Sequence, residues 1–158
     1  MKFICDDMLG KLARWLKVLG FDTYYEKDLP DNKLFKIALA EDRIILTRDS
    51  KIPKIRTAKN FVWIYSSDPL VQLKEVIQKL KLKVEPEKFF TRCLECNGVL
   101  EKIDKEKVKD KVWPYVYKTQ ENFVICPKCK RVYWEGTHVG RMKKKLETIS
   151  KISRISNE

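Results

Sequence analysis

The sequence predicts an α/β protein with a mainly parallel sheet, followed by a small metal-binding ribbon and a C-terminal helix. Three observations carry this prediction. Strand-like and helix-like segments alternate through the first 88 residues. Two C-x-x-C pairs follow in a region of short strands. A basic segment whose apolar residues have helical spacing ends the chain.

The chain begins with a predicted strand and helix. Residues 2–5 form a short apolar run that is typical of a buried strand. Apolar side chains then recur at helical spacing over residues 8–19, with lysine and arginine between them. Gly20 is suited to end this helix, because glycine readily adopts the left-handed conformation found after many helices.

The same alternation continues as far as a predicted linker. Residues 43–47 form the clearest strand, because their apolar run is continuous, as expected for a parallel strand buried on both faces. The other predicted elements are strands at residues 21–25 and 61–65, helices around residues 34–38 and 70–80, and the linker at residues 83–88. This order of elements is typical of a βαβ sheet.

Four of the five cysteines form two pairs, Cys93 with Cys96 and Cys126 with Cys129. Four thiolates at this spacing can surround a metal ion, so we predict a structural zinc site. Iron is an alternative, because tetrahedral thiolates bind it as well. Disulfides are a second alternative, although a reducing compartment disfavours them. Cys5 lies in an apolar run and is predicted to be a core residue.

The cysteine pairs define a second region, a zinc ribbon predicted at residues 89–138. Its short strands are expected at residues 99–103, 122–125 and 131–134. Because this region has almost no apolar core of its own, its folding is expected to depend on the metal. Residues 139–158 follow as a basic amphipathic helix and tail.

Charge and hydropathy narrow the classes of function. Lys and Arg number 34 against 22 Asp and Glu, and this net charge of +12 favours a polyanionic partner such as nucleic acid. No apolar run approaches the roughly 18 residues of a membrane span, and the N-terminal segment lacks the apolar core of a signal peptide. We therefore expect a soluble, cytoplasmic protein with no membrane partner. The oligomeric state stays open.

Two carboxylates directly follow predicted strands, Asp6 after residues 2–5 and Asp49 after residues 43–47. Ligands of open α/β sheets bind beyond the carboxyl ends of the strands, so we expect these two acids at one edge. Like charges held close together are costly unless a cation lies between them. Mg²⁺ or Mn²⁺ would take their oxygens and leave positions for a phosphate, which favours a metal-dependent phosphodiesterase.

Asp31 and Asp68 are further candidates, because each lies near a predicted junction between a strand and a helix. Helix capping is the alternative for both, since aspartate is a favoured N-cap residue. Capping explains Asp6 and Asp49 less easily, because both directly follow strands.

Residues 8–23, MLGKLARWLKVLGFDT, come soon after Asp6 and resemble the opening of the PIN-like RNase family named for the C-terminal domain of the Mut-seven exonuclease. Residues 44–49, IILTRD, resemble its second signature. The cysteine pairs and residues 133–138, YWEGTH, resemble its zinc ribbon and the segment that follows. The resemblance extends over residues 2–147.

This resemblance implies a PIN-like three-layer α/β/α domain at residues 1–88, an acidic site for Mg²⁺ or Mn²⁺, and cleavage of RNA. The catalytic acids that it implies are Asp6, Asp31, Asp49 and, by a looser match, Asp68. Family members often carry an acid soon after Asp31, where this chain has Asn32 and Lys33. Whether the site takes one metal ion or two stays open.

Several other side chains are candidates for contacting RNA. Arg14 and Arg48 are the cations nearest the acids in sequence, and each could orient a phosphate or pair with an aspartate. His138, the single histidine, is predicted to contact phosphate or to be structural. Candidates for stacking on bases are Trp113, Tyr115, Tyr117 and Trp134.

Three functions are consistent with these features. The first is a metal-dependent endoribonuclease acting on single-stranded RNA, with the ribbon helping to hold the substrate. The second is a non-catalytic RNA-binding or ribosome-associated zinc-ribbon protein, in which the acids are helix caps. The third is a phosphoryl-transfer enzyme of the receiver or haloacid-phosphatase type. It ranks last, because Met8 stands where an Asp would be needed and residues 64–69 supply no lysine.

Overall fold

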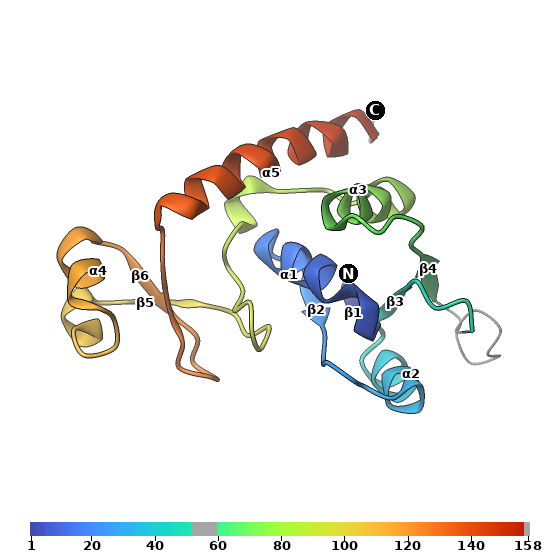
Figure 1. The fold of residues 1–158 in the computed structure, drawn as a ribbon, viewed down its shortest axis with the longest axis horizontal. Helices are drawn as coiled ribbons and strands as arrows, with labels where there is room; N and C mark the ends of the chain where they lie inside the picture. The colour runs from blue at the N-terminus through green and yellow to red at the C-terminus, as the bar shows by residue number, and fades with distance from the viewer. Residues whose placement is uncertain (52–59, 157–158) are drawn as a thin grey trace.

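The structure, a computed structural model, describes residues 1–51 and 60–156. Its larger sheet has four parallel strands in the spatial order β2-β1-β3-β4 (Figure 1). These strands are β1 (Lys2–Cys5), β2 (Asp22–Tyr24), β3 (Ile44–Thr47) and β4 (Phe61–Trp63). Because all four run in the same direction, their carboxyl ends lie at one edge, as predicted.

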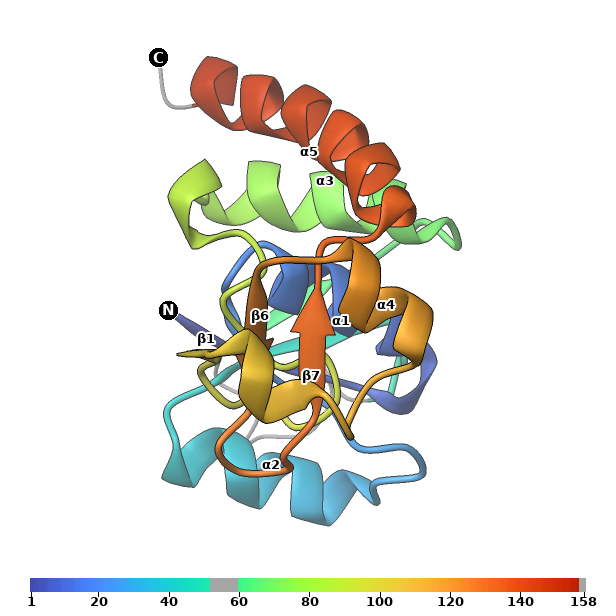
Figure 2. The same cartoon turned by 90° about the vertical axis from the view of Figure 1, so that its left-hand side faces the viewer.

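Helices cover both faces of this sheet and give the predicted three-layer α/β/α arrangement (Figure 2). The helices are α1 (Gly10–Val18), α2 (Asp31–Ala40) and α3 (Pro69–Leu80), and a 3₁₀ turn, η1 (Asp7–Leu9), precedes α1. Side chains of β1 alternate between the faces. Phe3 and Cys5 join the core beneath α1 and α3, whereas Ile4 packs against α2.

Gly20 ends the first helix region for two physical reasons. Its φ of 93° lies in the left-handed region, which other residues rarely adopt. A Cβ at this position would also lie 2.5 Å from the Lys88 carbonyl oxygen. Gly20 therefore lets the chain turn into β2 while the linker, with its 3₁₀ turn η3 (Pro86–Lys88), packs directly against it.

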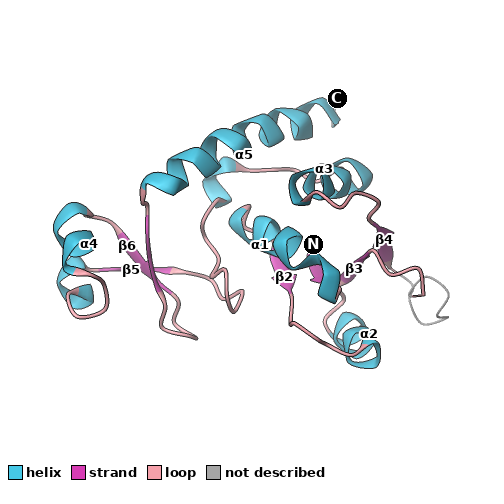
Figure 3. Cartoon of the chain, viewed as in Figure 1, coloured by secondary structure: helices cyan, strands magenta, loops and turns pink. Residues whose placement is uncertain are grey.

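The ribbon forms a separate sheet beside the helical layers (Figure 3). Its strands are antiparallel and lie in the order β5-β6-β7. Its strands are β5 (Glu101–Ile103), β6 (Phe123–Ile125) and β7 (Val132–Trp134). A segment between β5 and β6 contains a 3₁₀ turn, η4 (Lys105–Val108), and the short helix α4 (Pro114–Thr119). The sequence did not predict α4, because six residues are too few for a clear helical period.

The C-terminal helix α5 (Thr137–Ser156) packs over α3 and completes the larger core (Figure 1). Leu146 and Ile149 belong to the same buried cluster as the residues of α1 and α3. The Ser153 hydroxyl donates to the Leu82 carbonyl and accepts from the Val84 N–H. The basic helix is therefore docked, with its lysines outward. Among the described residues, no helix combines the length and hydropathy needed to cross a lipid bilayer.

Candidate functional site

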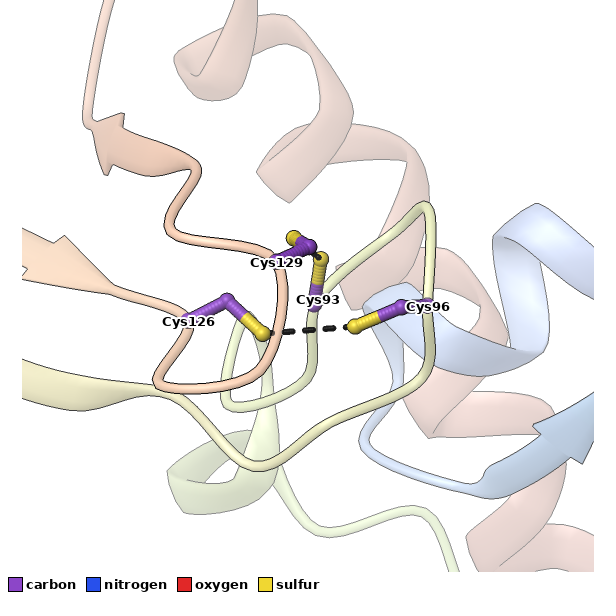
Figure 4. Close-up of side chains that lie close together, drawn as sticks. All are labelled: Cys93, Cys96, Cys126 and Cys129. Carbon is purple, nitrogen blue, oxygen red and sulfur yellow. Dashed lines mark hydrogen bonds between the residues drawn. The ribbon is translucent and has the colours of Figure 1, made fainter.

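Four cysteine side chains converge where the two C-x-x-C turns face each other (Figure 4). The Sγ atoms of Cys96 and Cys126 are 3.3 Å apart, and those of Cys93 and Cys129 are 3.5 Å apart. All four Sγ atoms lie within 4.8 Å of one another. Zn–S bonds of about 2.3 Å would set sulfur atoms about 3.8 Å apart in a tetrahedron. The four sulfur atoms therefore fit a metal ion such as zinc. None of the five cysteines of the chain, which all lie within the described residues, forms a disulfide.

The protonation of these thiols also favours a cation. Burial alone would raise the pKa of Cys93, but hydrogen bonds from the backbone at Cys96 and Glu95 and from the Tyr133 hydroxyl lower it to about 6. Burial and the neighbouring thiols raise the pKa of Cys96 to about 12. A second negative charge beside the first is costly. A metal cation among the four sulfur atoms would offset this repulsion.

The first C-x-x-C turn is fastened to the open edge of the parallel sheet. Asn97 accepts at Oδ1 from the Thr23 N–H at 3.0 Å and donates from Nδ2 to Asp22 Oδ1 at 2.7 Å. Nearby, Arg92 donates from Nε to the Gly20 carbonyl at 3.1 Å. The bond to Thr23 satisfies a backbone N–H that an edge strand would leave open, and the other two bonds hold the neighbouring Asp22 side chain and Gly20 carbonyl. The ribbon is therefore anchored directly on β2.

Asp6 ends β1 and is almost completely buried, with 5% of its surface exposed. Its Oδ1 accepts from the Met8 N–H at 2.9 Å and so caps η1. Its Oδ2 accepts from the Thr47 hydroxyl at 2.6 Å and from the Arg48 N–H at 2.8 Å. Three donors fix this carboxylate in one orientation between the ends of β1 and β3.

Asp49 lies just beyond β3, and a single hydroxyl connects it with Asp6. The Thr47 Oγ1 atom that donates to Asp6 accepts from the Asp49 N–H at 2.9 Å. The half-buried Asp49 carboxylate accepts at Oδ1 from the Lys51 N–H at 2.9 Å. The two acids therefore belong to one hydrogen-bonded group at the carboxyl edge of the sheet, which we call the acidic edge.

The other two predicted acids lie at the starts of helices. Asp31 is exposed and is the first residue of α2. Asp68 caps α3, because its Oδ1 accepts from the N–H groups of Leu70 and Val71 at 3.0 and 3.1 Å. Across residues 1–51 and 60–156, the cysteine tetrad is the only group of three or more His, Cys, Asp or Glu whose ligand atoms all lie within 4.8 Å. No three of the predicted acids approach one another that closely.

The predicted RNA contacts differ in how they are placed. Arg48 lies at the acidic edge, where its Nη2 donates to the Tyr65 carbonyl at 3.4 Å. Arg14 is exposed on α1. The side chain of His138 lies outside the described part of the chain.

Two residues that organise these sites were not singled out by the sequence analysis. Thr47 was predicted only as the end of a strand, although its position within Thr-Arg-Asp was an available signal. Asn97 has a φ of 69°, which asparagine tolerates better than most residues, but its contact with β2 has no local signature. Both act across long sequence separations.

Comparison with known proteins gives the family. The model of the Mut7-C RNAse domain matches residues 1–146. The chain belongs to the Mut7-C RNase family. The Exonuclease mut-7 homolog of Homo sapiens is 30% identical over 118 residues, which are 71% of this chain and 14% of the human protein. No solved structure matches the chain. Membership of the Mut7-C family confirms the resemblance and makes the protein a member of a nuclease family.

Proposed function

We propose that this Mut7-C protein is a divalent-metal-dependent endoribonuclease that hydrolyses single-stranded RNA at its acidic edge. Family membership supports the reaction class. The observation that carries the choice of site is the buried Asp6 carboxylate, which accepts from the Thr47 hydroxyl, the same hydroxyl that accepts from the backbone N–H of Asp49. Three hydrogen bonds offset the cost of burying Asp6 and hold it at the carboxyl edge, which is where α/β sheets bind ligands.

The donor chemistry of the acidic edge fits Mg²⁺ or Mn²⁺. Each carboxylate offers about four lone-pair positions, and the recorded hydrogen bonds use three on Asp6 and one on Asp49. Mg²⁺ keeps several waters and needs only one or two protein carboxylates, so Asp6 and Asp49 are a sufficient pair. A bound ion would supply charge stabilisation and a water of lowered pKa.

The protein's own groups then have defined tasks. Asp6 is fixed in one orientation by its three donors, and Asp49 is held through its N–H by Thr47. We propose that exposed Asp31 contacts water molecules around the ion. Asp68 caps α3, and we assign to it a peripheral position at the acidic edge. The guanidinium groups of Arg48 and Arg14 neutralise substrate phosphates. His138 is assigned to phosphate contact.

We assign catalysis to residues 1–88, metal-dependent support of RNA binding to the zinc ribbon at residues 89–138, and a basic docking element to residues 139–158. The metal of the tetrad is proposed to be zinc. Four of the five cysteines gather as metal ligands rather than as disulfides, which suits a reducing compartment, and we propose a cytoplasmic location.

The decisive experiment is cleavage of a circular single-stranded RNA with Mg²⁺ or Mn²⁺ by the purified 158-residue chain. A circle has no ends, so its cleavage separates an endonuclease from an exonuclease, the activity named for the human relative. Asp49→Asn should reduce the rate by at least about 100-fold, the scale seen when one charge-stabilising group is lost. Asp42→Asn is the matched control, because exposed Asp42 precedes β3 at the opposite edge of the sheet. Equal rates for wild type and Asp49→Asn would refute the site.

One observation favours a second function. Asp6 and Asp68 both act as helix N-caps, as the non-catalytic alternative expects. A binding module of this kind would retain single-stranded RNA without cutting it, at any concentration of divalent ion.

A further inference from the structure

The segment between β5 and β6 exposes two large aromatic rings. Trp113 is 78% exposed and Tyr115 is 76% exposed. Exposed tryptophan is uncommon, because the ring has a large apolar surface. The ring pairs recorded among the described residues include neither side chain. Both rings therefore present their faces to solvent.

Hydrogen bonds hold the backbone that carries the two rings. Trp113 precedes Pro114, and its carbonyl accepts from the Tyr117 N–H at 3.0 Å. The Tyr115 carbonyl accepts from the Thr119 hydroxyl at 2.8 Å. Helix α4 thus holds the two rings on a fixed support, which lowers the entropic cost of using them for binding.

The other predicted stacking residues are occupied within the protein. The Tyr117 ring lies under Lys105 Nζ, 5.1 Å from the ring centroid. Trp134 packs against Phe123, with ring centroids 6.4 Å apart. Only Trp113 and Tyr115 of the four predicted residues combine an aromatic face with high exposure.

The surroundings of these rings are cationic. Between Lys105 and Lys118 the chain carries five lysines against two acids. The side chains of Lys107, Lys109, Lys111 and Lys118 are exposed. Aromatic faces beside mobile cations are the chemistry that holds unpaired bases and their phosphates. Figure 1 shows α4 at the end of the ribbon that lies away from the parallel sheet, so these rings are separate from the acidic edge.

We infer that Trp113 and Tyr115 form a stacking platform for unpaired bases of single-stranded RNA, separate from the acidic edge. The inference rests on the proposed function for the identity of its ligand. A duplex keeps its bases stacked on one another, so the platform selects single strands. Stacking on a protein ring is tolerant of sequence, which suits a nuclease without a fixed recognition site.

The test is a titration of the zinc-loaded 158-residue chain with a short oligouridylate. The buffer contains no Mg²⁺, Mn²⁺ or chelator, so that the RNA stays intact and the zinc stays bound. Wild-type tryptophan fluorescence should be quenched on binding. Trp113→Ala and Tyr115→Ala should each weaken binding by about tenfold, because this is the contribution of one base stacked on an aromatic ring to the binding affinity. Trp113→Phe keeps an aromatic face and should retain most of the affinity.

Controls separate stacking from charge and from folding. Leu39→Ala removes a side chain that is 80% exposed on α2 and should bind like wild type. The salt dependence should not change in the alanine variants, because no charge is removed. Affinity for a blunt RNA duplex should be the same for all variants, and circular dichroism should confirm that each is folded.

The outcomes are distinguishable from those of the nuclease test. Wild-type affinity in the Trp113→Ala, Tyr115→Ala double variant would overturn the platform, as would an equal loss for Trp113→Phe and Trp113→Ala. If the double variant keeps wild-type RNA affinity, and a protein partner binds the wild type saturably but not the double variant, the rings are a protein-docking surface instead. If Asp49→Asn cleaves normally while Trp113→Ala loses RNA affinity, the catalytic site is wrong and the platform stands.

Discussion

Replacing Thr47 by valine removes the atom that connects the two proposed metal-binding acids. Thr47 is fully buried, and its hydroxyl both donates to Asp6 at 2.6 Å and accepts from the Asp49 N–H at 2.9 Å. Valine has nearly the same shape and the same β-branching, so it leaves no cavity and keeps the preference for a strand. The change therefore tests the hydroxyl alone.

The expected cost follows from the two bonds. A hydrogen bond to a charged carboxylate contributes about 1.5–3 kcal/mol, and an N–H left without an acceptor costs about 1–3 kcal/mol. Allowing for the favourable burial of a methyl group, the free energy of unfolding should fall by about 2–4 kcal/mol. For a chain of this size each kcal/mol lowers Tm by about 2–4 °C, so Tm should fall by about 4–16 °C.

Thermal unfolding followed by circular dichroism measures this loss, and cleavage of single-stranded RNA measures its consequence. Cleavage should fall more than the folded fraction, because Asp49 is no longer held beside Asp6. Thr47→Ser keeps the hydroxyl and should recover most of both. The matched control is Thr23→Val, since Thr23 is equally buried on β2 but its hydroxyl donates only to the Phe21 carbonyl, at 3.0 Å. If Thr47→Val unfolds and cleaves like Thr23→Val, the proposed link between the acids is wrong.

Three further changes test the rest of the structure. Asn97→Ala should lower the free energy of unfolding by about 2–4 kcal/mol, because it removes both bonds to β2 and places alanine at positive φ. Asn97→Gly relieves the backbone and should recover about 1 kcal/mol, which urea titration would detect; identical midpoints would contradict the role of φ. Cys126→Ser should abolish the single bound zinc measured by elemental analysis and unfold the ribbon sheet while the α/β core stays folded; full zinc content would argue against the tetrad. Gly20→Ala should lower Tm by several degrees through its clash with the linker, and an unchanged Tm would mean that the chain adjusts freely there.

The sequence predicted most of the α/β part because its signals are local. Four strands and three helices lie close to their predicted positions, since buried parallel strands are continuously apolar and the helices have regular spacing. Gly20 was recognised from helix-ending chemistry alone. Its second role, the close approach of residue 88, depends on tertiary packing and could not be predicted from the residue itself.

The candidate sites divide in the same way. The four cysteines carry their chemistry in their spacing, so their convergence was predictable. The prediction that the ends of β1 and β3 meet depended only on strand order, and the register of Cys5 with Leu46 agrees with it. The hydrogen bond from Thr47 to Asp6 joins residues 41 positions apart in the sequence, and the bond between Asn97 and Thr23 joins residues 74 positions apart. No local sequence pattern encodes contacts over such separations.

The anchor on β2 connects the metal tetrad with the acidic edge. Asn97 directly follows the ligand Cys96 and holds the backbone of Thr23, while β2 pairs with β1, the strand that carries Asp6 at its end. A zinc ion would fix the first C-x-x-C turn, and that turn would fix the position of the ribbon against the sheet. A ribbon that only needed to bind RNA could be joined by a flexible linker. Its direct attachment to β2, the neighbour of the strand that ends at Asp6, argues that the ribbon sets where bound RNA would meet the proposed catalytic acids.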